Sequence, residues 1–73
     1  MVVSYNNLWK MLIDRGMTKT QMRLKAGIST VTLARMSRGM PVNLSIIGKV
    51  CDALGCHAGD VVDFIPQQKE KKN

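Results

Sequence analysis

The 73-residue sequence is poor in aromatic residues and has no long apolar run. One Trp, one Tyr and one Phe leave few rings for stacking on unpaired bases, so RNA is an unfavoured partner. No run approaches the roughly 18 apolar residues that a membrane-spanning helix requires. The first residues, MVVSYNN, lack the basic start and the apolar segment of a secretory signal peptide. We therefore expect a cytoplasmic protein that does not cross a membrane.

The chain also lacks the clusters that are typical of catalytic and metal sites. Its single histidine, His57, has only its direct neighbour Cys56 as a nearby nucleophile, which is a poor arrangement for activation. Cys51, Cys56 and His57 offer three soft ligands, whereas structural zinc takes four. We expect both cysteines to pack in the core and His57 to lie on the surface or to cap a helix. The sequence thus predicts no enzyme, no metal site and no cofactor.

Acidic residues are scarce and unevenly placed. The chain has 5 Asp and Glu against 11 Lys and Arg, for a net charge of +6. Eight of the basic residues lie between Lys10 and Lys49 with a single acid, Asp14, whereas Val50–Gln68 holds three acids and no Lys or Arg. A basic surface suits a polyanion such as nucleic acid. A basic run alone is explained as well by a solvated surface, so the local motif decides between them.

Helical spacings dominate and alternating strand patterns are absent, which predicts an all-α fold of five short helices. The expected helices run from Ser4 or Tyr5 to about Arg15, through two segments inside Met17–Gly39, from Asn43 to Gly55, and roughly from Ala58 to Ile65. Residues 1–66 are expected to form one small domain. Residues 67–73 are expected to form a polar, disordered tail.

The segment Met17–Gly39 predicts two helices joined by a glycine turn. Thr18 and Gln21 have the spacing of a capping box at the start of the first helix. Gly27 suits its end, and Ser29 suits the start of the second. The outward side of the second helix carries small or basic side chains: Thr30, Val31, Thr32, Ala34, Arg35 and Arg38. A helix pair of this kind commonly places its second helix in the DNA major groove.

This pattern resembles the Cro and phage-repressor type of DNA-binding domain, also called the Xre family. The resemblance covers about Tyr5 to Ile65 and is carried by Thr18-Lys19, Met22, Ala26-Gly27-Ile28-Ser29, Leu33, Met36, Arg38-Gly39, Pro41-Val42-Asn43-Leu44, Ala53-Leu54-Gly55-Cys56 and Gly59-Asp60-Val61. It implies a lambda-repressor-like fold whose second and third helices form a helix-turn-helix. It also implies a transcriptional regulator that occupies a sequence-specific operator in double-stranded DNA.

The resemblance further implies roles for single positions. Base edges would be contacted by Thr30, Val31 and Arg35, and the DNA backbone by Lys19, Thr32, Arg38, Gly39 and Met40. Two departures from the family pattern matter. Arg23 stands where the family has Ala, so its side chain must turn outward or open the helix pair slightly. Thr30 and Val31 replace the usual Gln or Asn, which leaves Arg35 as the strong base contact and predicts modest specificity.

The end of the chain suggests how copies associate. Val62, Phe64 and Ile65 are more apolar than one short helix needs for its own domain, so we expect them to form a homodimer contact. The alternative is that Phe64 belongs to the core and the chain is a monomer that pairs only on DNA. A second function is also open, namely an antitoxin-like or anti-repressor-like module with a protein partner. The outward face of the helix Ser29–Arg38 carries neither the acids nor the large apolar residues that such a role would tolerate.

Overall fold

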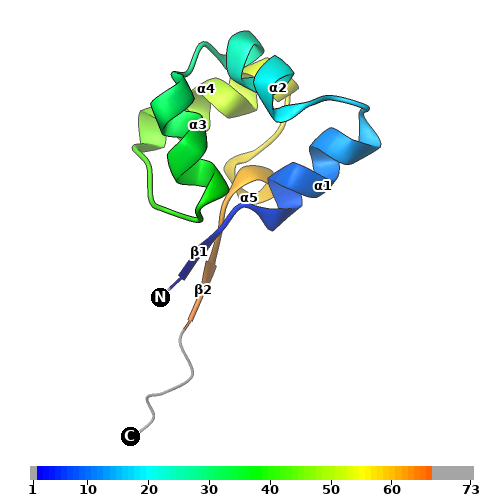
Figure 1. Cartoon of the computed structure of the whole chain (residues 1–73). Coiled ribbons are helices and arrows are strands. Elements are labelled where there is room, and N and C mark those ends of the chain that lie inside the picture. Colours follow the sequence, from blue (N-terminus) through cyan, green and yellow to red (C-terminus); the bar gives the residue numbers. More distant parts are fainter. Residues whose placement is uncertain (1, 67–73) are drawn as a thin grey trace, which may run out of the picture.

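The computed structural model describes residues 2–66 and has five helices and two short strands within that range (Figure 1). The elements are β1 (Val2–Ser4), α1 (Asn6–Asp14), α2 (Lys19–Ala26), α3 (Thr30–Ser37), α4 (Leu44–Leu54), α5 (Ala58–Val61) and β2 (Asp63–Ile65). The helices gather into one body, and β1 and β2 project from it side by side as a ribbon (Figure 1). The expected tail, residues 67–73, lies outside the described residues.

The expectation of an all-α fold is wrong at both ends of the chain. β1 and β2 pair in antiparallel fashion, with Val2 opposite Ile65 and Val3 opposite Phe64. The last helix ends at Val61 instead of continuing to Ile65. The chain becomes extended there because valine, isoleucine and phenylalanine favour strands and find partners in the valines of β1. Strands of three residues are too short to show an alternating pattern in the sequence.

The local signals of the α2–α3 unit, residues 18–39, are confirmed. Thr18 Oγ1 accepts the Gln21 N–H at 3.1 Å, and Gln21 Oε1 accepts the Thr18 N–H at 2.8 Å, which completes the capping box. Gly27 ends α2 with φ 72°, a left-handed conformation that glycine adopts without a steric penalty. Ser29 Oγ accepts the Thr32 N–H at 3.1 Å at the start of α3. These bonds fix where both helices begin and how the chain turns between them.

A single core holds this unit in place. Every helix contributes to it, and its buried apolar side chains are Tyr5, Leu8, Leu12, Met22, Ile28, Met36, Ile47, Val50, Leu54 and Val61. Met22 and Met36 have no exposed surface, and Ile28 fills the turn between α2 and α3. The inward faces of α2 and α3 are therefore fixed on the core, so their opposite faces point to solvent in a defined orientation.

The two cysteines pack against the edge of this core, but neither is fully buried. Burial raises the pKa of the Cys56 thiol, and the neighbouring Cys51 raises it further, which disfavours a reactive thiolate. His57 is exposed, and its backbone N–H donates to Asp60 Oδ2 at 3.1 Å at the start of α5. Among residues 2–66 no three His, Cys, Asp or Glu side chains lie close enough to hold a metal ion. No helix in this range is long and apolar enough to cross a membrane.

Candidate nucleic-acid interface

α3 presents its polar side away from the core. Thr30, Val31 and Arg35 are exposed, and Val31 keeps 69% of its surface in contact with solvent. Val31 and Arg35 are four residues apart, so they lie one above the other on the same side of the helix. Met36 faces the opposite way, into the core. The three side chains that the sequence assigned to base contacts are thus brought together on one outer surface.

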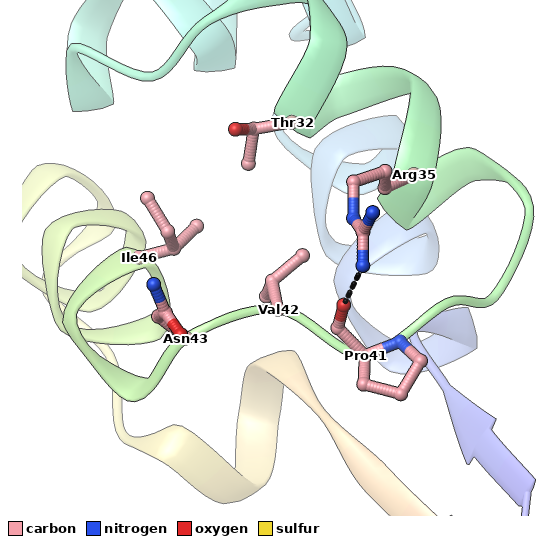
Figure 2. Close-up of a pocket in the computed structure, with 6 residues that line it drawn as sticks. All are labelled: Thr32, Arg35, Pro41, Val42, Asn43 and Ile46. Atoms are coloured by element: carbon pink, nitrogen blue, oxygen red, sulfur yellow. Dashed lines mark hydrogen bonds between the residues drawn. The ribbon is translucent and has the colours of Figure 1, made fainter.

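Arg35 is tethered to the segment that follows α3. Its Nη2 donates a hydrogen bond to the Pro41 carbonyl oxygen at 3.2 Å (Figure 2). The bond spans one side of a hollow of about 350 Å³ that is lined by Thr32, Arg35, Pro41, Val42, Asn43 and Ile46. A guanidinium group has five N–H donors, so most of them stay free. The tether lowers the number of orientations that Arg35 samples before it meets a ligand.

Asn43 stands at the N-cap of α4, as the sequence predicted, but its side chain makes no capping hydrogen bond. The amide lies at the rim of the same hollow as Arg35 (Figure 2). The sequence predicted only that a helix begins at Asn43, a residue type that is favoured at helix starts.

Tyr5 anchors the segment after α3 to the start of α1. Its hydroxyl donates to the Met40 carbonyl oxygen at 2.7 Å, and the residue is only 2% exposed. Burial raises the pKa of Tyr5, although the nearby positive charge of Arg35 lowers it in part. The sequence predicted only that the first helix begins at Ser4 or Tyr5 and did not assign this bond. The signal for it was the hydroxyl itself, since a buried tyrosine hydroxyl usually finds a partner.

The N–H groups of Gly39 and Met40 are already used within the chain. Gly39 N–H donates to the Met36 carbonyl and Met40 N–H to the Arg35 carbonyl, both at 3.0 Å. These bonds close the C-terminal end of α3. The exposed side chain of Arg38 is therefore the stronger donor that this segment offers to an anion.

Thr32 also bonds locally. It is half-buried, and its Oγ1 accepts a hydrogen bond from Ser29 Oγ at 2.9 Å. Its own hydroxyl hydrogen remains available as a donor.

Lys19, the first residue of α2, touches two other helices. Its Nζ lies 4.2 Å from the centroid of the Trp9 ring, which belongs to α1. The same Nζ lies 3.5 Å from Ser37 Oγ, at the end of α3 and at the outer limit of a hydrogen bond. Neither Trp9 nor Ser37 was connected with Lys19 in the sequence, because their contact depends on how three helices pack.

The unusual Arg23 is accommodated by turning its head group toward the interhelical turn. The side chain is half-buried, and Nη1 donates to the Ile28 carbonyl oxygen at 3.3 Å. The long side chain thus bonds a carbonyl of the turn while Ile28 itself stays in the core. The head group therefore lies against the turn between α2 and α3 and does not extend freely into solvent.

The ribbon exposes the apolar residues that the sequence assigned to a dimer contact. Phe64 is 57% and Ile65 46% exposed, and Val2 on the paired strand is 45% exposed. Val62 is half-buried. The alternative that Phe64 belongs to the core is wrong, whereas Val61 does lie in the core. Within residues 2–66 these apolar side chains are therefore left partly exposed to solvent.

Comparisons with known proteins agree with this geometry. A family model described as the Cro/C1-type HTH DNA-binding domain matches residues 7–67. Among solved structures, the crystal structure of the transcriptional regulator VanUg, form II, is similar with a TM-score of 0.86 and 39% sequence identity, covering 90% of this chain and 88% of that chain. No curated protein sequence matches. The family match confirms the resemblance seen in the sequence, and the chain belongs to the Cro/C1-type helix-turn-helix DNA-binding domain family.

Proposed function

We propose that this protein is a transcriptional regulator that binds double-stranded DNA sequence-specifically and acts by occupying an operator. In this proposal α2 and α3 are the helix-turn-helix, and α3 enters the major groove. The observation that carries it is the outer surface of α3, where Thr30, Val31 and Arg35 are exposed together. The family match and the similar transcriptional regulator support the same function.

The proposed base contacts follow from side-chain chemistry. Arg35 would leave or share its bond with Pro41 and donate to O6 and N7 of a guanine. Thr30 and Val31 would contact thymine methyl groups, which discriminate less than a bidentate pair. The backbone contacts would come from Lys19, Thr32 and Arg38, and from the segment at Gly39 and Met40.

We further propose that the regulator is a homodimer on a pseudo-palindromic site. An isolated two-stranded ribbon is marginally stable, and its free edges and exposed Phe64 and Ile65 suit a second copy of the same ribbon. Asp63 is the sole charged residue of β2, and no Lys or Arg lies between Val50 and Gln68, so pairing there brings little repulsion beyond the aspartates. A two-fold dimer would place its two α3 helices about 34 Å apart, one turn of DNA.

Selection of binding sites from random duplex DNA tests the function directly. The expected result is a short motif repeated with inverted symmetry, with its half-sites separated by about one helical turn. Recovery of no motif, with weak binding to all duplexes, would contradict sequence-specific regulation. Binding to no duplex at all would favour the second candidate, a module whose exposed ribbon meets a protein partner instead.

A further inference from the structure

Three helices converge on the ammonium group of Lys19. Trp9 of α1 lies under it, with 4.2 Å between Nζ and the ring centroid, and Ser37 of α3 lies 3.5 Å away. The Trp9 ring is itself held by Tyr5, with 6.3 Å between the ring centroids and a tilt of 53°. Because Tyr5 is buried, this side of the ring rests on the core. The position of Lys19 is thus set by tertiary packing.

This arrangement differs from that of an ordinary surface lysine. A free lysine side chain loses much conformational freedom when it binds an anion, and that loss weakens the contact. The electron-rich face of an indole attracts the ammonium group and limits its motion beforehand. The ring attracts the positive charge of the Lys19 ammonium group, and the three N–H donors of that group are not all consumed by this attraction. At least one donor stays free for an oxygen atom even when Ser37 accepts another.

We propose that Trp9, assisted by Ser37, is a positioning residue that holds Lys19 ready for a phosphate of the DNA backbone. This proposal rests on the proposed DNA-binding function. It gives Trp9 a role in addition to packing, and it predicts that α1, which carries none of the residues assigned to DNA contacts, contributes to affinity. The phosphate lies on the solvent side of the ammonium, opposite the ring.

A double-mutant cycle separates positioning from simple packing. The affinity of the full chain for a random-sequence duplex is measured for Trp9→Leu in the native background and in a Lys19→Ala background. With Lys19 present, Trp9→Leu is expected to weaken binding about two- to fivefold, the range of an exposed cation–π contact. With Lys19 absent, Trp9→Leu is expected to leave affinity unchanged. Trp9→Tyr keeps an aromatic face and is expected to restore most of the loss.

A measurement without DNA checks the contact itself. An indole ring shifts the proton resonances of groups above its face, so the Lys19 ε-methylene signals are expected upfield in the native chain and shifted back in Trp9→Leu. If Trp9→Leu fails to fold in a thermal unfolding scan, Ser37→Ala carries the cycle in its place. Ser37→Ala is then expected to weaken binding only when Lys19 is present.

The outcomes distinguish this inference from the function on which it rests. Equal losses in both backgrounds would show that Trp9 acts through the fold alone. Tighter binding by Trp9→Leu would show that the ring competes with the phosphate for Lys19. DNA binding that is insensitive to Lys19→Ala would also overturn the inference, and each of these results leaves DNA binding intact. Failure of the native chain to bind duplex DNA at low salt would instead contradict the proposed function.

Discussion

In the α2–α3 unit Met22, Ile28 and Met36 point into the core although Leu24 and Val31 face solvent, whereas every large apolar side chain of β2 faces solvent. Met22, Ile28 and Met36 are buried beneath the helix pair, and its outer surface carries polar and basic side chains together with Leu24 and Val31. Phe64 and Ile65 are about half exposed on the ribbon, whose outer edges have no further strand beside them among residues 2–66. The helix pair is complete within one chain and offers a surface to a polyanion. The ribbon instead exposes the apolar side chains that we propose as a homodimer contact.

The largest expected effect comes from removing one side chain that is buried under the helix pair, and this effect is a loss of folding stability. Met36→Ala is expected to lower the free energy of unfolding by about 2–5 kcal/mol, because it leaves a cavity beneath α3. Leu44→Ala is the matched control, since Leu44 is 82% exposed, and it is expected to change stability by less than about 0.5 kcal/mol. Urea unfolding measures both. Similar small changes for the two variants would mean that α3 is not seated on the core.

A second variant tests whether the ribbon needs a partner. Phe64→Ala combined with Ile65→Lys is expected to weaken self-association by about 2 kcal/mol or more, because two-fold symmetry counts each lost contact twice. Ile13→Lys on α1 is the control, since it adds the same charge at a residue that is 76% exposed. Sedimentation velocity with and without the selected DNA site measures association. A native chain that stays monomeric and fills single half-sites without cooperativity would rule out the dimer.

A third variant sharpens the view of α3 as the base-contacting element. Arg35→Ala is expected to cost about 1–3 kcal/mol at one base pair and to relax the preference there. Lys49→Ala removes the same charge from exposed surface of α4 and is expected to leave the preference unchanged. Competition between the selected site and its single-base variants measures the effect. An intact preference in Arg35→Ala would mean that α3 does not dock through this surface.

The sequence predicted the α2–α3 unit well because its signals are local. The capping box joins Thr18 to Gln21, and the second cap joins Ser29 to Thr32, each over three residues. A short polar side chain can form these capping hydrogen bonds independently of the tertiary fold. The residue types at that spacing are therefore enough to predict where each helix begins. Gly27 acts in the same local way, through its own left-handed backbone.

The features that the sequence did not predict depend on residues that are far apart in the chain. Val2 pairs with Ile65 from the opposite end of the chain, and no local pattern indicates that pairing. The contact of Lys19 with Trp9 and the bond from Tyr5 to Met40 likewise require the packed helices. The outward position of Thr30, Val31 and Arg35 on α3 was easier to predict, because a helical face follows from the 3.6-residue period. Their assignment to base contacts came from the family resemblance.

The salt dependence of DNA affinity tests the central claim most directly, namely that the basic surface around α3 binds the phosphate backbone. The native chain is expected to bind duplex DNA with a steep negative slope of log K against log salt concentration, about 0.9 per phosphate contact. Lys19→Ala and Arg38→Ala are each expected to flatten that slope by about 0.9, and Lys49→Ala to leave it unchanged. Equal affinity at low and high salt, or equal flattening by all three variants, would contradict the claim.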